Sequence, residues 1–241
     1  MALRFVMLLA FVLAGFAGYS QETTTKKSFR PDIPGSVLVE LGVNVVSGNA
    51  PSHFQKGFWG SRTINFYYQY PIRLFKSNFS LNPGIGLSLE RWKLTNDYTI
   101  ASRPGKDGTY RLLPADSIFT GSTIHRSQLV NNYIEMPLEL RYDTNPEDIA
   151  RSFNISFGGR VGYLYDSFAK VDYRENSENK SNKDKQMHGM NPIRYGLYTR
   201  FGLGGFSLFG YFNMSPMYEK DKGPEKTTMT SMTFGISING F

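Results

Sequence analysis

The stretch that decides the fold covers residues 131–165 and reads NNYIEMPLELRY (131–142), DTNPEDIARS (143–152) and FNISFGGRVGYLY (153–165). In the first and third of these runs, apolar side chains occupy alternate positions: Ile134, Met136, Leu138 and Leu140, then Phe153, Ile155, Phe157 and Val161. A period of two indicates a β-strand with one apolar face, because successive side chains of a strand point to opposite faces. The polar run between them is short, which predicts two neighbouring antiparallel strands.

The same alternation recurs in six further segments. They cover residues 37–45, 63–72, 79–93, 194–203, 206–214 and 231–239. The chain is also 15% aromatic, a composition that favours strands over helices. The sequence therefore predicts an all-β fold of about eight antiparallel strands, and an even number allows both chain ends to lie on the same side of a closed up-and-down barrel.

The connections between these segments alternate in length. The long ones are 48–61, 94–126, 171–192 and 216–226, and the short ones are 74–78, 143–152 and 204–205. Long external loops opposite short periplasmic turns are the layout of bacterial outer-membrane barrels. The second and third long connections are polar, and we expect both to be exposed and mobile.

Alternation alone does not say which face of each strand is buried. In a membrane barrel the apolar face points to lipid, whereas in a soluble sandwich or lipocalin-like barrel it points to a core. The polar face favours the membrane barrel, because it carries glycines and charges of both signs, which fit a narrow lumen. The expected structural charge network in this lumen consists of Glu40, Glu90, Glu135, Glu139, Arg141, Arg160, Arg194 and Arg200. In the soluble alternative these groups lie on the surface.

Aromatic residues near the predicted strand ends also favour a membrane location, since rings with a polar tip concentrate at the two membrane–water boundaries. These residues are Trp59, Tyr68, Tyr70, Trp92, Tyr142, Tyr163, Tyr165, Tyr195, Tyr211 and Tyr218.

The first twenty residues, MALRFVMLLAFVLAGFAGYS, have the pattern of a secretory signal: Arg4, an apolar centre, and small residues before Gln21. The apolar centre is shorter than the roughly 20 residues of a spanning helix. We therefore expect a cleaved signal peptide at 1–20, a periplasmic segment at 21–35 and a barrel at 36–241. The chain has no cysteine, which excludes disulfides and a lipoprotein anchor.

The formal net charge is +7, and Arg4 contributes one of these charges. A secreted basic chain seldom meets nucleic acid, so we expect none as a partner. Outer-membrane lipid and lipopolysaccharide are the anionic partners that suit this location.

The sequence offers little chemistry. The histidines are His53, His125 and His188, and none belongs to a cluster with metal-ligand spacing. His125 and Ser127 form an H-x-S pair that resembles the His–Ser pair of lipid A deacylases, but their predicted face is the lumen rather than the lipid. Glu135 and Glu139 share a strand face and could act as an acid–base pair, although the nearby arginines favour an internal salt network. We expect no catalytic residue, no metal and no cofactor.

The runs at 131–142 and 153–165, together with YGLYTRFGLGGFSLFGYFNMSPMY (195–218) and MTFGISINGF (232–241), resemble an outer-membrane β-barrel family of Bacteroidetes described as PorT-like or porin family proteins. The resemblance covers most of the chain and implies an eight-stranded barrel at the cell surface. It also implies that Phe241 is a signal for the barrel-assembly machinery. Phe241 is out of phase with Phe234, Ile236 and Ile238, so either Asn239–Gly240 forms a bulge or the signal is read loosely.

These observations predict a structural or interaction protein of the outer membrane whose external loops, 94–126 and 171–192, contact a partner or a surface glycan. A role as an accessory of a protein secretion system follows from the resemblance alone. A lipid A-modifying hydrolase using His125 and Ser127 is the enzymatic alternative. A narrow channel is the fourth hypothesis for the function.

Overall fold

The computed structural model describes residues 35–51, 53–54, 59–94 and 97–240. The expected signal peptide at 1–20, the segment 21–35 except for its last residue, and Phe241 lie outside the described residues. All the elements below belong to the unit that runs from Pro34 to Phe241.

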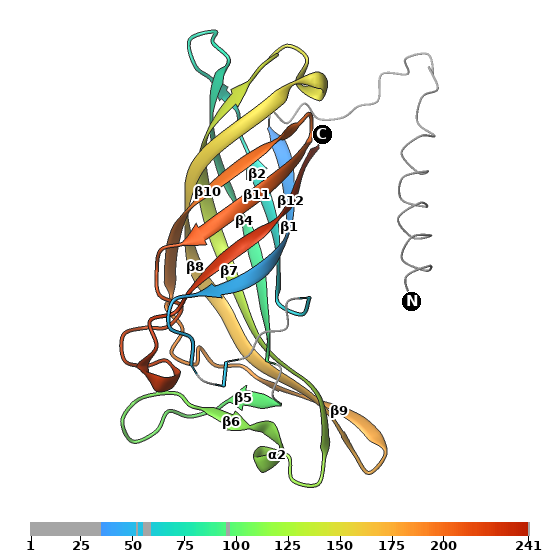
Figure 1. The fold of residues 1–241 in the computed structure, drawn as a ribbon, viewed down its shortest axis with the longest axis vertical. Helices are drawn as coiled ribbons and strands as arrows, with labels where there is room; N and C mark the ends of the chain where they lie inside the picture. The colour runs from blue at the N-terminus through green and yellow to red at the C-terminus, as the bar shows by residue number, and fades with distance from the viewer. Residues whose placement is uncertain (1–34, 52, 55–58, 95–96, 241) are drawn as a thin grey trace. The chain divides into compact units, whose positions relative to one another are not determined.

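Eight long antiparallel strands form one closed barrel, as the alternation predicts (Figure 1). They are β1 (Ser36–Ser47), β2 (Arg62–Gln69), β4 (Phe79–Leu94), β7 (Thr123–Asp143), β8 (Phe153–Glu175), β10 (Ile193–Leu203), β11 (Phe206–Asn213) and β12 (Thr230–Gly240). Each strand pairs with the next of these along the chain, and β12 pairs with β1 from Val37 opposite Gly240 to Ser47 opposite Thr230. Closure removes the sheet edges that an open sheet would expose. It also excludes the two-layer sandwich.

Short elements occupy the connections. They are β3 (Ile72–Arg73), β5 (Tyr98–Ile100), β6 (Leu112–Pro114), β9 (Glu178–Asp184), the helix α2 (Ala115–Ile118) and the 3₁₀ turns η1 (Ile149–Arg151) and η2 (Pro224–Lys226). Within the described residues, no helix is long and apolar enough to cross a membrane. The barrel end that carries β5, β6, α2 and β9 is called the loop end below, and the opposite one the turn end (Figure 1).

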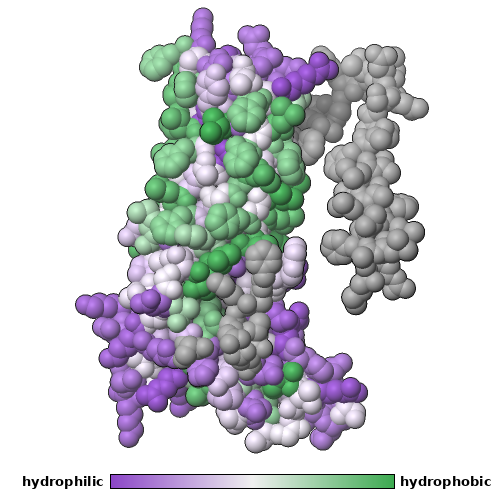
Figure 2. Space-filling model, viewed as in Figure 1, coloured by the Kyte–Doolittle hydropathy of each residue, from purple (hydrophilic) through white to green (hydrophobic). Residues whose placement is uncertain are grey.

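The apolar side chains of the barrel strands point outward. Phe157, Met136 and Leu203 are each about 60% exposed, whereas their strand neighbours Glu135 and Arg160 are buried. On the face drawn in Figure 2, hydrophobic residues form a band across the wall, with hydrophilic residues at both ends. A soluble protein would show the reverse arrangement, because an exposed apolar band of this size is stable only against lipid or a partner.

The structure corrects the predicted loops at the loop end. β7 begins at Thr123 and β8 ends at Glu175, so both strands extend beyond the barrel. β9 pairs with the extension of β8 as an antiparallel hairpin, from Ala169 opposite Asp184 to Glu175 opposite Glu178. The segments expected to be mobile, 94–126 and 171–192, thus contain regular strands. The sequence prediction missed β9 because both faces of this strand are polar, and a polar strand has no alternation to detect. In the extension of β8, Ala169, Val171 and Tyr173 do alternate with polar residues, and the predicted loop 171–192 began inside this alternation.

Tight turns connect the strands at the turn end and at the tip of the β8–β9 hairpin. Phe75 and Lys76 both have positive φ, and so do Asn176 and Ser177 in the β8–β9 turn. Two successive residues with positive φ are typical of the two-residue hairpin turns whose twist matches that of the strands. In the β10–β11 turn, Gly204 has a φ of +59°, and an added Cβ would lie 2.6 Å from the carbonyl oxygen of Ala150, so only glycine fits there.

Candidate functional site: a sealed lumen below an ordered loop end

The polar face of every barrel strand points into the lumen. Glu40 of β1, Glu90 of β4 and Arg200 of β10 are each no more than 3% exposed. Glycines on the same face make room for large rings: an added Cβ at Gly158 would lie 2.8 Å from the ring of Tyr198, and one at Gly196 would lie 2.8 Å from the ring of Tyr211. The lumen is therefore filled by side chains rather than by water.

Seven of the eight residues predicted for the charge network form one continuous chain of ion pairs across the lumen. Arg160 Nη1 lies 3.2 Å from Glu40 Oε2 and 3.6 Å from Glu135 Oε2. On one side the chain continues from Glu135 to Arg194, at 2.7 Å, and from Arg194 to Glu90, at 3.3 Å.

On the other side, the chain continues from Glu40 to Arg200, at 2.9 Å, and ends with an ion pair between Arg200 and Glu139. Each arginine bridges two glutamates, so three cations meet four anions. Such pairing is required, since an unpaired buried charge carries a large desolvation cost.

Tyrosines complete the network. The Tyr67 hydroxyl donates to Glu135 and accepts a hydrogen bond from Arg160. The guanidinium of Arg160 lies 3.9 Å from the ring centre of Tyr211, and its Nε and Nη2 atoms have no hydrogen-bond partner among the described residues. The guanidinium of Arg194 lies 3.7 Å from the ring centre of Tyr133. Ring faces attract cations, so they partly replace the missing acceptors.

Arg141 lies apart from the other seven residues. Its guanidinium donates to both carboxylate oxygens of Asp143 on the same strand, at 2.9–3.0 Å. This pair lines a cavity of about 280 Å³ at the turn end. The prediction grouped Arg141 with the network because it shares a face with Glu139, but it omitted Asp143, which shares that face as well. Strand parity also places Tyr67 and Tyr198 in the lumen, and the prediction left both out of the network.

The loop end of the lumen is closed by a hydrophobic cap. The cap consists of Phe54, Trp92, Leu94, Ile100, Leu129, Tyr133, Leu164, Ala169, Met190, Met217, Tyr218 and Met229. Met190 and Tyr218 come from two different connections and form a β-bridge. The prediction of Trp92, Tyr211 and Tyr218 as boundary aromatics is therefore wrong, because all three are buried inside. Tyr163, Tyr165 and Tyr195 are exposed on the wall.

His125 and Ser127 do not form a catalytic pair. The register of β7 against β8 shifts between Ile124 and Arg126, so His125 lies in an irregularity of the strand. His125 is exposed, whereas Ser127 is 2% exposed and its Oγ has no hydrogen-bond partner among the described residues. An activated serine requires a hydrogen-bonded base, and no such contact is present.

His188 is the one histidine of the three that the structure buries. Its Nε2 lies 3.3 Å from Asp184 Oδ2, and its ring packs edge-on against Tyr110 at 5.8 Å. Burial lowers the pKa of His188 below its usual range, and Asp184 offsets part of this effect. Among the described residues, no group of three His, Cys, Asp or Glu side chains has metal-binding geometry.

Comparison with known proteins assigns the family. Residues 20–219 match the family model of the outer membrane protein beta-barrel domain. No curated protein matches the chain significantly. Among solved structures, the chain is similar to Ail, the attachment invasion locus protein of Yersinia pestis, with 12% identity over 86% of this chain and 97% of that chain and a TM-score of 0.36.

A second similar structure is Neisserial surface protein A (NspA), with 10% identity over 85% of this chain and 96% of that chain and a TM-score of 0.34. One structure of Ail contains the heparin analogue sucrose octasulfate. Likeness at this level carries no inference about ligands of this chain. The family match covers most of the sequence, and it agrees with the closed barrel and its apolar band: the chain belongs to the outer membrane protein β-barrel domain family and lies in the outer membrane.

Proposed function

We propose that this protein is a non-conducting membrane anchor that presents its ordered loop end to a partner or glycan at the cell surface. The observation that carries this proposal is the double closure of the barrel, by the chain of ion pairs in the lumen and by the hydrophobic cap above it.

A channel requires a continuous column of water. The side chains of Glu40 and Glu135 are 0% exposed, so water does not reach the centre of the lumen. Above them, Trp92 and Met229 are also 0% exposed within the cap. Two successive closures of different chemistry make it difficult for any one side-chain movement to open a pore.

The loop end, by contrast, is built to be rigid and accessible. The extensions of β7 and β8 form a three-stranded sheet with β9, and six of the seven β9 residues are exposed. Arg126 binds Asp172 through its Nε at 2.8 Å, which joins the first two of these strands. A rigid polar surface costs less conformational entropy on binding than a mobile loop does.

The two other roles receive less support. An accessory role in secretion rests on the sequence resemblance alone, and normal protein export in a deletion strain would count against it. A lipid A hydrolase requires a His125–Ser127 contact that the barrel does not make. Lipid A mass spectra that change on Ser127→Ala would restore that hypothesis.

The test combines two measurements on the full chain. In planar bilayers we expect no conductance steps, with a general porin in parallel as the positive control. In intact cells, a photoreactive amino acid at Asn182 of β9 should give one adduct of defined mass, whereas one at Glu147 in a short turn should not. Discrete conductance steps, or the absence of an adduct from Asn182, would overturn the proposal.

A further inference from the structure

A group of cations lies on the outer wall of the barrel at its loop end. We call it the cationic collar, and it consists of Arg62, Arg91, Lys93, Arg126, Lys170, Arg174 and Lys183. These residues come from the loop-end halves of five neighbouring strands, β2, β4, β7, β8 and β9. The net charge of the chain gave no indication of this clustering.

Strand parity places the collar on the outer face. Arg62 shares a face with the exposed Phe66, and Arg91 and Lys93 share a face with the exposed Leu87. In β8 the register against β7 shifts at Tyr165, because Tyr133 pairs with Leu164 and Asn132 with Asp166.

This irregularity reverses the phase of β8. Before it, the odd-numbered residues face outward, and after it the even-numbered ones do. Lys170 and Arg174 consequently continue the outer wall, although their numbers have the parity of the lumen residue Arg160.

The collar is continuous across the strands. Arg62 lies opposite Arg91 in the β2–β4 pairing. Lys93 lies opposite Gln128, Gln128 opposite Lys170, and Lys170 opposite Lys183. Gln128 is thus the only uncharged position in that row.

The positive charge of the collar is largely uncompensated. No carboxylate among the described residues forms an ion pair with Arg62, Arg91 or Lys93. The acidic groups on this face are Asp172, which pairs with Arg126 and Lys170, and Asp166, which accepts from the Asn132 side chain. Like charges directly opposite each other destabilise a sheet, so the Arg62–Arg91 pair acts against folding unless an anion lies between the two side chains. Lys170 pairs with Asp172, and Lys183 lies over the ring of Phe168, 3.6 Å from its centre.

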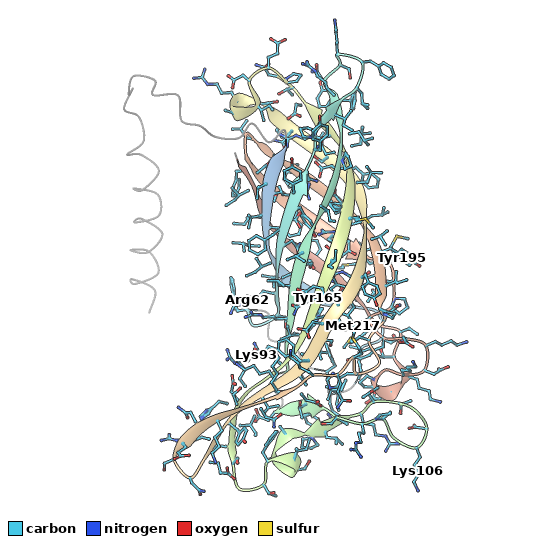
Figure 3. The ribbon with its side chains drawn as sticks, turned by 180° about the vertical axis from the view of Figure 1, so that it is seen from behind. Arg62, Lys93, Lys106, Tyr165, Tyr195 and Met217 are labelled. Atoms are coloured by element: carbon cyan, nitrogen blue, oxygen red, sulfur yellow. The ribbon has the colours of Figure 1, made fainter. Side chains whose placement is uncertain are left out.

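The collar borders the lipid-facing band. The next outward residues toward the turn end are Ile64 on β2 and Leu89 on β4, and on β7 Val130 and Asn132 come between Gln128 and Ile134. Figure 3 places Arg62 and Lys93 at the loop end of the wall near Tyr165, an exposed aromatic of the boundary type. Trp59, which is 81% exposed, precedes Arg62 in the chain.

The collar covers one side of the barrel only. At the same end, Ile193 and Tyr195 of β10 and Met214, which directly follows β11, are all exposed and uncharged. A general electrostatic attraction to the membrane would not require such an asymmetry. A site for a discrete anionic molecule would.

We propose that the cationic collar binds the phosphate groups of lipid A, the phosphorylated glycolipid of the outer leaflet, while its acyl chains lie against the apolar wall below. The loop end faces outward in this family of barrels, so the collar is at the depth of the outer-leaflet headgroups. Arginine suits this role because its planar fork binds phosphate oxygens in pairs. This inference does not depend on the loops having a partner.

The test uses the full chain in detergent, titrated with purified bisphosphorylated lipid A and followed by native mass spectrometry. The variant is Arg62→Gln/Arg91→Gln/Lys93→Gln, which removes three charges but keeps polar side chains of similar reach. The matched control, Arg103→Gln/Lys106→Gln/Lys220→Gln, removes three exposed loop cations outside the collar. Figure 3 shows Lys106 far out among the loops.

We expect the collar variant to bind lipid A roughly 100-fold more weakly, since each basic side chain near an anionic headgroup contributes about a factor of five in affinity and three of them are removed. The control variant should bind as the wild type does. Equal affinities in all three proteins would overturn the proposal. If the collar variant does not fold, Lys93→Gln/Lys183→Gln tests the same surface with fewer changes, and an unchanged affinity there is equally decisive.

Two further ligands identify the source of the phosphate. Dephosphorylated lipid A should bind about as weakly to the wild type as lipid A binds to the collar variant. Phosphatidylglycerol should compete poorly, because it offers one phosphate where the collar spans several strands. Full competition by phosphatidylglycerol would overturn the assignment to lipid A. None of these outcomes affects the photocrosslinking at Asn182, so this inference and the proposed function fail separately.

Discussion

The most informative perturbation is Glu135→Gln, because Glu135 holds the centre of the lumen network. One carboxylate oxygen accepts from Arg194 Nε at 2.7 Å. The other accepts from the Tyr67 hydroxyl and lies 3.6 Å from Arg160 Nη1. Glutamine keeps the shape of the side chain and one acceptor but removes the charge. The substitution therefore divides one chain of ion pairs into two, and each neighbouring arginine keeps a single carboxylate.

The expected cost follows from burial. Glu135 is 0% exposed, and Arg160 and Arg194 are at most 4% exposed, so solvent does not screen the loss. Breaking a buried ion pair by removing one partner destabilises a protein by about 3–5 kcal/mol. Because both arginines keep another glutamate and Gln keeps an acceptor, we expect about 3 kcal/mol. Glu139→Gln should cost less, since Glu139 forms an ion pair with Arg200 alone.

The assay is reversible urea unfolding in lipid vesicles, with the shift in gel mobility between unboiled and boiled samples as the readout of the folded barrel. Glu147→Gln, an exposed change in the turn between β7 and β8, is the control and should fall within about 0.5 kcal/mol of the wild type. The order of destabilisation should be Glu135→Gln, then Glu139→Gln, then Glu147→Gln. If Glu135→Gln matched the control, water would be screening the lumen, and the sealed barrel would be the wrong description.

Three other changes probe the cap and the wall. Trp92→Ala removes a side chain that is 0% exposed and whose ring centre lies 6.0 Å from that of Phe54. We expect the free energy of unfolding to fall by about 3–5 kcal/mol and trypsin to cleave the loops faster. An unchanged cleavage rate would contradict the description of the cap. Gly158→Val should place a branched side chain against Tyr198 and the carbonyl oxygen of Leu138, lowering the urea midpoint of unfolding by an amount equivalent to about 1–3 kcal/mol or more. Since burial lowers the pKa of His188 in the folded state, its contribution to stability is complete above about pH 6.5, the ordinary pKa of histidine, and is lost as the pH falls. The protection factors of the amides of residues 187–190, in which the intrinsic pH dependence of exchange is removed, should therefore fall between pH 7.5 and pH 5 in the wild type but not in His188→Asn, where asparagine tolerates the positive φ of this position.

The sequence by itself determined the architecture of the wall. Alternation in eight segments gives the strand number, and the parity of Glu40, Glu135 and Arg200 gives the face on which the charges lie. These features are local, because the direction of a side chain on a strand depends only on its position in the pleat. The family match and the closed sheet confirm this part of the prediction.

Partner choice within the lumen was decided by the tertiary structure. Glu40 and Arg160 are 120 positions apart in the chain, and they meet because the strand registers and the closure of β12 onto β1 set their heights in the barrel. Parity could not separate Arg141, which pairs with Asp143, from the arginines that cross the lumen. Parity also failed beyond Tyr165, where one irregularity reverses the faces of β8.

The loop end was likewise beyond the sequence prediction. The cap combines inward-facing residues of β4, β7 and β8 with single residues of several connections, such as Phe54, Met190 and Met229. Isolated apolar residues in polar connections carry no periodic signal. The collar is another product of assembly, because Arg62, Arg91 and Lys183 become one surface only when five strands lie side by side. The local sequence pattern determines on which face of a strand a residue lies. The registers between all neighbouring strands, together with the closure of the barrel, determine which residues it contacts.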